Sequence, residues 1–267
     1  MNSVFGYVVD YPFILNLLTI NAIGERSVVL KLLTWNIRQG GSVKRIPRIV
    51  EQLSKHSPDV LLLTEYWEGG KGEEIKRLLR ENGYEYMISS NGDIKQNSLL
   101  FASRYPFEIV PSFYNKDRNG QRWLEIRIPQ YELHITGVHI PTNNNDVQEK
   151  LQFWQEINAF AKEQGSFRTV IIGDYNKGLE EDKQGTPFIG PQYMQELVDL
   201  GWIDAWRHTH GPFSGYSWYS TKGNGFRIDH AFISPVLKGN ILESYFSHQE
   251  RLNSLSDHSI LVVELNI

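Results

Sequence analysis

Residues 170–176 read V-I-I-G-D-Y-N: three branched apolar side chains, a glycine, and then an acid and an amide two positions apart. Such a short apolar run predicts a buried strand, which Gly173 ends. In extended backbone the side chains of Asp174 and Asn176 point the same way, so two oxygen donors are expected at the C-terminal end of the strand. Oxygen donors of this kind hold Mg²⁺ while it bridges to substrate phosphates. Gly-Asp-x-Asn also describes many tight turns, so its meaning depends on polar residues at the ends of other strands.

The composition is that of a globular chain without a global basic surface. At 267 residues the chain could form one large domain or two small ones, and 40% hydrophobic residues are ample for a core. The absence of cysteine excludes disulfides, thiolate metal sites and a cysteine nucleophile. The net charge is −4, so any nucleic-acid binding must be local, with metal ions offsetting carboxylates.

The first thirty residues differ from the rest of the chain. The segment Val4–Ile23 is fairly apolar, but Asp10, Pro12 and Asn16 interrupt it. It fits neither a spanning helix, which needs about 20 mostly apolar residues, nor a signal peptide, which begins with basic residues. We expect residues 1–29 to be an extension that packs on or precedes the domain as an extra strand or helix. A start codon assigned too early is the alternative.

From residue 30 onward, short apolar runs alternate with amphipathic segments. Helices are expected after Ser42, which can cap the first of them, and at residues 73–81, 146–164 and 192–200. The expected strands are Val28–Thr34, Asp59–Thr64, Tyr84–Ile88, Ser98–Ala102, Trp123–Ile128, Leu133–Val138, Val170–Ile172, Tyr216–Tyr219, Phe226–Ser234, Ile241–Phe246 and Ser259–Leu265. No repeat or linker interrupts them, so we predict one domain over residues 30–267. Helices between strands, with an antiparallel tail, predict an α/β (α+β) fold of mixed sheets covered by helices.

Polar residues stand at the ends of many of these strands. Those that directly follow an apolar strand are Asn36, Glu65, His139, Asp174 and Asn176. In α/β sheets, sites gather outside the carboxyl ends of strands. Asp257 and His258 precede the final strand, which would bring them to the same edge if it runs antiparallel.

Each of these residues also has a structural explanation. Asn36 can be a turn former, Glu65 an exposed strand end and His139 a hydrogen-bonded core histidine. Asp257 and His258 can form a polar turn. Asp229, inside an apolar run, is harder to explain in this way, because a buried carboxylate is costly without a partner. The combined spacing favours a shared function.

Seven segments, taken in order, resemble the signatures of the endonuclease/exonuclease/phosphatase superfamily. They are W-N-I-R (35–38), L-L-L-T-E (61–65), F-A-S-R-Y-P (101–106), G-V-H-I-P (137–141), I-I-G-D-Y-N (171–176), R-I-D-H-A-F-I-S (227–234) and S-D-H-S-I-L-V-V-E-L (256–265). That group includes deoxyribonuclease I, exonuclease III-type apurinic endonucleases, neutral sphingomyelinases and inositol polyphosphate 5-phosphatases. The resemblance implies a four-layered sandwich, in which two mixed β-sheets pack face to face with helices outside and the active site lies at one sheet edge.

The resemblance also implies roles for the matching residues. Mg²⁺, with Mn²⁺ as a possible substitute, would be held by Glu65 with Asn36 and Asp257. Asp174 would orient or deprotonate the attacking water, and Asn176 would hold the phosphate or the metal. The remaining catalytic residues would be an Asp229–His258 pair and His139, which would face the phosphate from the other side.

Four further features bear on the subgroup and the substrate. His139 resembles the two-histidine branch with deoxyribonuclease I, and Arg38 stands where many apurinic endonucleases carry an Asp. A cation there could contact a phosphate, which favours one metal ion over two. Trp218 resembles a family position near the site and could line the substrate groove, with core packing as the alternative. The loop Asn115–Arg122, with three basic residues, could grip a nucleic-acid backbone or be an ordinary solvated loop.

These features predict a Mg²⁺-dependent nuclease that hydrolyses DNA phosphodiester bonds by in-line attack of water. The alternative is a phosphatase or phosphodiesterase for a small-molecule or lipid phosphate, although no large apolar loop for membrane binding is evident. A binding module that has lost activity is disfavoured, because no expected acid or histidine is missing. We further expect a cytoplasmic monomer that binds nucleic acid and does not insert into membranes.

Overall fold

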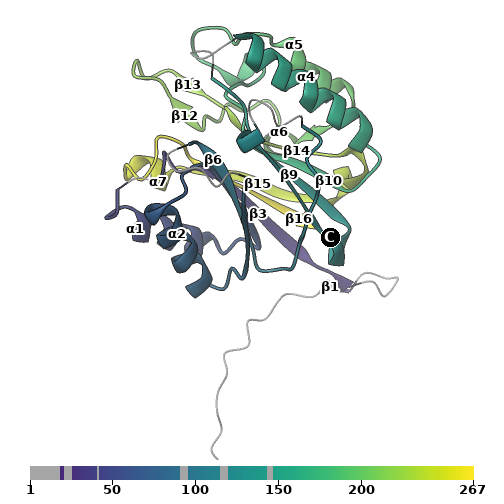
Figure 1. Cartoon of the computed structure of the whole chain (residues 1–267). Coiled ribbons are helices and arrows are strands. Elements are labelled where there is room, and N and C mark those ends of the chain that lie inside the picture. Colours follow the sequence, from purple (N-terminus) through teal and green to yellow (C-terminus); the bar gives the residue numbers. More distant parts are fainter. Residues whose placement is uncertain (1–18, 21–25, 41, 91–95, 115–119, 143–146) are drawn as a thin grey trace, which may run out of the picture.

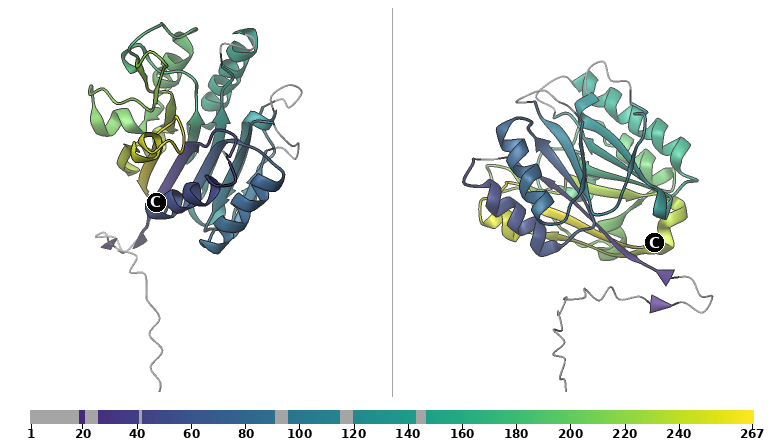
Figure 2. Two further views of the ribbon diagram at one scale, coloured as in Figure 1. Left: turned by 90° about the vertical axis from the view of Figure 1, so that its left-hand side faces the viewer. Right: turned by 60° about the horizontal axis from the view of Figure 1, so that its bottom comes forward.

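Two β-sheets lie face to face with helices on their outer surfaces (Figure 1; Figure 2). The structure is a computed structural model, and it describes residues 19–20, 26–40, 42–90, 96–114, 120–142 and 147–267. Each of the two large sheets has six strands and mixes parallel with antiparallel pairs. The predicted α/β sandwich of two mixed sheets is confirmed.

The first sheet has the strand order β15-β16-β3-β4-β6-β5. Its strands are β3 (Val29–Asn36), β4 (Val60–Tyr66), β5 (Tyr86–Ser89), β6 (Ser98–Ser103), β15 (Ile241–Ser247) and β16 (Ile260–Asn266). Strand β3 pairs in parallel with β4 and antiparallel with β16. The last strand therefore lies inside the sheet, and its beginning is beside the ends of β3 and β4.

The second sheet has the strand order β11-β14-β10-β9-β8-β7. Its strands are β7 (Glu108–Ile109), β8 (Trp123–Ile128), β9 (Leu133–His139), β10 (Thr169–Asp174), β11 (Ile203–Asp204) and β14 (Asp229–Ile233). Strand β10 pairs in parallel with β9 and antiparallel with β14. Two small hairpin-like pairs stand outside the large sheets: β1 (Thr19–Ile20) with β2 (Arg26–Ser27), and β12 (Trp218–Tyr219) with β13 (Gly225–Phe226).

Helices cover the outer face of each sheet. The first sheet is covered by α1 (Ile46–His56) and α2 (Gly70–Glu81), and the second by α4 (Val147–Gln164) and α5 (Gln192–Asp199). Two short helices, α6 (Ala205–His210) and α7 (Gln249–Leu252), lie near the sheet ends (Figure 1). None of the helices in the described part of the chain has the length and apolarity needed to cross a membrane.

Successive side chains of a strand point to opposite faces of its sheet, and this alternation explains how the sheets and helices form layers. In β4, Leu62 packs in the core between the sheets, whereas Leu61 and Leu63 pack under α1 and α2. In β10, Ile172 faces the first sheet, whereas Ile171 packs under α4 and α5. Strands buried on both faces read as continuous apolar runs, which is why these segments could be recognised as strands in the sequence.

The structure corrects several details of the sequence prediction. Ser42 does not cap α1 with its side chain; the N-cap residue is Arg45, and the Ser42 carbonyl accepts from its backbone N–H. Asn176 is not extended, since its φ is 47°. Helix α6 (Ala205–His210) was not among the predicted helices. Most of the predicted extension, residues 1–18 and 21–25, lies outside the described residues, and the boundary at residue 30 stays a prediction.

Candidate active site

Pairing register brings polar residues of the second sheet side by side. Asp174, the last residue of β10, stands opposite His139 of β9 and opposite Asp229 of β14. All three are at least 98% buried. In the first sheet Asn36 ends β3, and His258 lies two residues before β16, which runs antiparallel to β3. One edge of the sandwich therefore collects side chains from both sheets.

Asp174 is the centre of this group. Its Oδ2 accepts a hydrogen bond from Asn36 Nδ2 at 2.9 Å, which joins the two sheets. Its Oδ1 accepts from the backbone N–H of Asn176 at 2.9 Å, and this bond forms the turn in which Asn176 has its positive φ. The Asn176 side chain then donates to the carbonyl of Ile140 at 2.8 Å. The carboxylate is thus held by donors on two sides.

His258 and Asp229 form the predicted pair. His258 Nδ1 lies 2.9 Å from Asp229 Oδ2, and its Nε2 lies 3.9 Å from Asp174 Oδ2. The carboxylate oxygen can only accept, so the imidazole donates its Nδ1 proton to Asp229. Burial alone would lower the pKa of His258, but the charges of Asp229 and Asp174 and the hydrogen bond that His258 donates to Asp229 raise it to about 10. His258 is therefore an imidazolium at neutral pH.

His139 lies on the other side of Asp174 in a different state. Its Nε2 is 3.7 Å from Asp174 Oδ2, and its Nδ1 is 3.1 Å from a terminal nitrogen of Arg122. Because a guanidinium can only donate, Nδ1 is the acceptor and the proton sits on Nε2. Burial, followed by the charges of Arg122 and His258, holds the pKa of His139 well below its usual value. His139 is a neutral donor that faces the Asp174 carboxylate.

The environment of Asp174 favours proton exchange near neutrality. Burial raises its pKa to about 6; the charge of His258 and the hydrogen bonds from Asn36 and Asn176 lower it, while the charge of Asp229 raises it further. A carboxylate whose pKa lies near the working pH is suited to act as a general base.

Asp257, Arg38 and Trp218 lie together beside this row. Arg38 Nε is 3.6 Å from Asp257 Oδ1, and Trp218 Nε1 donates to Asp257 Oδ2 at 3.3 Å. The Trp218 backbone also forms a bridge to His258, so the β12–β13 pair adjoins the site. The Arg38 side chain is 55% exposed, and the Arg38 backbone has a φ of 46°. The guanidinium is therefore partly open to solvent beside Asp257.

Glu65 occupies a distortion of β4. The pairing of β4 with β6 shifts register between Leu63 and Tyr66, and Glu65 has a φ of 51°. Such a bulge re-aims a side chain at the edge of a sheet. Asp174, Asp229 and His258 place ligand atoms within 4.8 Å of one another; Glu65 and Asp257 lie outside that cluster.

The residues predicted to hold Mg²⁺ all carry oxygen donors. Glu65, Asp257 and Asn36 offer carboxylate and amide oxygens, the ligands that Mg²⁺ prefers. One oxygen of Asp229 is buried without a hydrogen-bond partner among the described residues. Asp257 Oδ1 makes no hydrogen bond there either, but it has the Arg38 guanidinium at 3.6 Å. An orphaned buried carboxylate oxygen is costly unless a cation or water completes it.

Two cations at this edge were not identified from the sequence as site residues. Arg122 was considered only as part of the loop Asn115–Arg122, of which residues 115–119 lie outside the described part. The predicted strand pair 123–128 and 133–138 places residue 122 opposite residue 139 when its register is continued. The position of Arg122 beside His139 could therefore have been predicted from the sequence. Lys150 of α4 is 2% exposed and donates to the carbonyl of Asn176 at 2.8 Å. It precedes Trp154 by one helical turn on the buried face, which is an unusual place for a lysine.

Comparison with known proteins identifies the chain's relatives. The sequence profile described as Endonuclease/Exonuclease/phosphatase family matches residues 33–258, which is most of the chain. No curated protein sequence matches.

Solved structures share the fold at low sequence identity. An AP endonuclease from Archaeoglobus fulgidus superposes with a TM-score of 0.77 at 19% identity, covering 89% of this chain and 100% of its own. The 3′-5′ exonuclease NExo from Neisseria meningitidis has a TM-score of 0.75 at 21% identity with the same coverage. A structure of the 3′ phosphatase NExo from Neisseria bound to a product DNA hairpin gives the same values. At these identities the likeness shows the fold alone.

Proposed function

The chain belongs to the endonuclease/exonuclease/phosphatase family, and from this premise we propose that it is a Mg²⁺-dependent nuclease that hydrolyses phosphodiester bonds in DNA. One observation carries the proposal: Asp174 lies between an imidazolium and a neutral imidazole, Nε2 of His258 and Nε2 of His139, at 3.9 and 3.7 Å. A base between two proton donors can accept a proton from water while the donors face the phosphoryl oxygens.

In the proposed reaction, Asp174 orients the attacking water and takes its proton. The Nε2–H groups of His139 and His258 donate hydrogen bonds to the phosphoryl oxygens, whose charge grows as the bond to water forms. The bond between phosphorus and the leaving oxygen breaks at the same time, and the leaving oxygen takes a proton from solvent. Asp229 keeps His258 charged and fixes its ring through the Nδ1 hydrogen bond. Asn176 and Arg122 hold the phosphate against the Asp174 carboxylate.

Glu65, Asn36 and Asp257 are the proposed holders of Mg²⁺, with Mn²⁺ as a possible substitute. The bound cation supplies neutralisation of charge on the phosphate and on the leaving oxygen. Arg38 beside Asp257 adds a guanidinium, which suits planar contacts to a phosphate. The catalytic domain of this proposal is residues 30–267.

DNA is the proposed substrate because the solved structures with this fold include an AP endonuclease and a NExo complex with a DNA hairpin. Exposed cations at the site, of which Arg38 is one, give local attraction to a polyanion in a chain whose net charge is −4. Trp218 stands beside Asp257 and offers an aromatic edge to the substrate groove.

The test compares one purified preparation on supercoiled plasmid, an abasic duplex, a 3′-phosphorylated duplex, RNA and a phosphoinositide, each with Mg²⁺ or EDTA. We expect DNA hydrolysis with Mg²⁺ and none with EDTA. His258→Ala and Asp174→Ala should each lower turnover by about 10²–10⁴-fold, the range of general acid–base catalysis, while circular dichroism shows a folded protein. Leu242→Ala, at a half-exposed position of β15, is the control and should keep wild-type turnover.

Three results would count against the proposal. Turnover of the phosphoinositide alone would replace the nuclease with the lipid phosphatase alternative. Hydrolysis that EDTA leaves unchanged would remove the metal role of Glu65, Asn36 and Asp257. Near-normal turnover by folded His258→Ala or Asp174→Ala would remove the proposed chemistry.

A further inference from the structure

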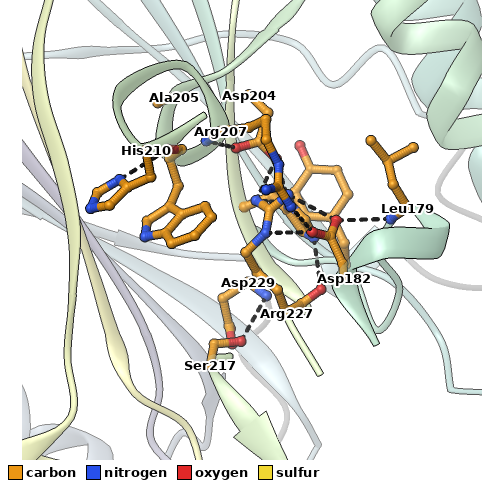
Figure 3. Close-up of polar contacts among 12 residues, drawn as sticks. Leu179, Asp182, Asp204, Ala205, Arg207, His210, Ser217, Arg227 and Asp229 are labelled. Carbon is orange, nitrogen blue, oxygen red and sulfur yellow. Dashed lines mark hydrogen bonds and ion pairs between the residues drawn. The ribbon is translucent and has the colours of Figure 1, made fainter. Parts of the chain in front are cut away.

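A buried ion network lies next to Asp229, one member of the proposed catalytic row (Figure 3). Its centre is Arg227, which lies two residues before Asp229. The Arg227 side chain has no exposed surface. The network, called the Arg227 cluster below, consists of Asp182, Asp204, Arg207, Arg227 and His230.

Each nitrogen of the Arg227 guanidinium has an acceptor. Nε and one terminal nitrogen donate to the two oxygens of Asp182 at 2.9 and 2.8 Å, a forked contact. The other terminal nitrogen donates to Asp204 Oδ2 at 2.6 Å. The guanidinium carbon also lies 5.0 Å from the centre of the Trp206 ring. Arg207 completes the charge balance by pairing with Asp182.

The opposite charges of the cluster keep its buried acidic and basic groups ionised. Burial would raise the pKa of Asp204, but the charge of Arg227 and the contacts with His230 hold it well below its usual value. Two carboxylates and two guanidiniums cancel. A buried set of this kind can often be replaced by apolar residues without loss of stability, so stability alone does not account for it.

The cluster joins the two segments that carry catalytic residues. On one side is the loop after β10, which contains Asn176: His230 Nε2 lies 2.9 Å from the carbonyl of Lys177. On the other side is the start of β14: the backbone N–H of Arg227 donates to the carbonyl of Asp182 at 2.8 Å. Ser217 Oγ accepts from the backbone N–H of Asp229 at 3.2 Å, as Figure 3 shows.

We propose that the Arg227 cluster is a positioning device that holds the Asp229 carboxylate within hydrogen-bonding distance of His258 Nδ1. This inference rests on the proposed function for its kinetic consequence but not for its geometry. No member of the cluster contacts the reacting atoms in the proposal. Asp229 reaches His258 with one oxygen, at 2.9 Å, and its other oxygen is buried without a partner among the described residues. A shift of β14 by a fraction of an ångström would therefore lengthen the contact that orients the imidazolium.

The principal variant is charge-balanced. Arg227→Met alone would leave two carboxylates with one guanidinium, so it is combined with Asp204→Asn. The double variant keeps the Arg207–Asp182 pair, and Asn can replace Asp204 as the N-cap of α6. We expect a folded protein whose kcat is lowered about 10–100-fold, with KM within about twofold, because substrate contacts are unchanged.

A second variant covers the case in which the double variant unfolds. Arg227→Lys keeps the charge but loses the fork, so it should fold and show a kcat reduced about tenfold. The matched control is Lys31→Met combined with Glu264→Gln. It removes an ion pair with a 2.8 Å contact between β3 and β16, far along the strands from Asn36 and His258. This control should keep the wild-type kcat.

A spectroscopic readout separates positioning from a general loss of stability. The Nδ1 proton of His258, observed by NMR and assigned by its loss in His258→Gln, reports the hydrogen bond to Asp229. It should move upfield in both Arg227 variants and stay in place in the control. A folded Arg227 variant that keeps both the wild-type kcat and this resonance would overturn the proposal. If the wild-type protein cleaves none of the substrates, the proposed function fails, and the resonance alone then decides the positioning proposal.

Discussion

The residues with the sharpest chemistry here are two histidines within 4 Å of the same carboxylate. His258 has Asp229 behind it and is charged, whereas His139 has Arg122 behind it and is neutral. The difference comes from the sign of the neighbouring charge, since both rings are buried. The pair thus offers a strong and a weak hydrogen-bond donor at the same edge.

The pH dependence of turnover follows from these neighbours. Because burial raises the pKa of Asp174 to about 6, kcat/KM should fall as the pH drops through 6 and the base takes up a proton. It should fall again as the pH rises toward 10 and His258 loses its proton. A steady-state profile over this range checks both limbs. A profile that stays flat from pH 7 down to pH 4 would contradict the assignment of Asp174 as the base.

Arg122 gives a second prediction at this scale. Arg122→Gln keeps a donor but removes the charge and the fork. We expect kcat/KM to fall by about 10–100-fold, and the pKa of His139 to rise, because the charge of Arg122 lowers it. NMR titration of His139 measures this shift. Arg127→Gln, whose side chain is half exposed at the far end of β8, is the control and should leave turnover unchanged.

Individual residues were only partly predictable from the sequence. Asp174 and His258 were predicted at strand ends, where sequence spacing can indicate a site. Asp229 was predicted inside a strand, but it is the first residue of β14. Arg122 and Lys150 were not assigned to the site, because their placement depends on strand register and on the packing of α4. The charge states of His139 and His258 depend on contacts across the fold, which the sequence does not show.

At the scale of elements, the end of β10 has a backbone conformation and a close contact that favour glycine. Gly173 has a φ of 148°, and a Cβ at this position would overlap the carbonyl oxygen of Val138 on β9. Gly173→Ala should therefore lower the free energy of unfolding by about 2 kcal/mol or more, as strain at a special conformation does. Urea unfolding measures this loss. Gly239→Ala, where a Cβ meets nothing, is the control. Equal stability of the two variants would show that β10 accommodates the methyl group.

The loop after β10 gives a stability prediction with a defined sign. Burial and the charge of Lys150 lower the pKa of Lys177 from 10.5 to about 7, although Glu196 raises it. Between pH 7 and 10.5 the unfolded chain then binds more protons than the folded one, so stability should rise with pH. The slope is at most ~1.4 kcal/mol per pH unit for one proton.

Lys177→Met should remove this rise, because methionine does not titrate. Urea unfolding at pH 6.5, 8 and 9.5 compares the slopes of the variant and the wild type. Lys222→Met, at an exposed position, is the control and should keep the wild-type slope. Parallel slopes for Lys177→Met and the wild type would contradict the lowered pKa.

Elements were predictable in proportion to their length and periodicity. The continuous apolar runs of β4 and β10 and the amphipathic α4 were recognised with small errors at their ends. Helix α6 has only six residues and was not predicted, because so short a segment shows no helical period. Asn176 was expected to be extended, but its backbone bond to Asp174 turns the chain.

At the scale of the whole molecule, the contact between the sheets supports the site. Gly137 of β9 approaches the first sheet so closely that a Cβ there would lie 2.7 Å from Leu62 Cδ1 and 3.1 Å from Phe101 Cε2. Asn36 and Asp174, which join the sheets by a hydrogen bond, depend on this close packing for their separation. The stability of the sandwich and the geometry of the site are therefore linked.

Leu62→Ala tests the core. It should lower the free energy of unfolding by about 2–5 kcal/mol, the usual cost of a buried leucine truncation. Leu242→Ala, at a position that is 50% exposed, should cost about 0.5 kcal/mol or less. Chemical denaturation measures both. A loss below 1 kcal/mol for Leu62→Ala would show that the sheets close around the cavity.

The overall architecture was predictable because the ordered motifs resembled a known superfamily, and the sandwich is confirmed. Apolar runs alone indicated mixed sheets covered by helices but not two sheets face to face. The Arg227 cluster could not be foreseen, since Asp182, Asp204 and Arg227 come from three segments with no shared periodicity.

The central position of β16 has a consequence for biosynthesis. Strand β16 is synthesised after all the other strands in the described part of the chain. Asp257 and His258 come immediately ahead of it. During elongation the first sheet therefore has a gap beside β3, and the nascent polypeptide has no imidazolium to face Asp174. The proposed hydrolysis therefore requires that residues 257–266 have been synthesised and that β16 has paired with β3.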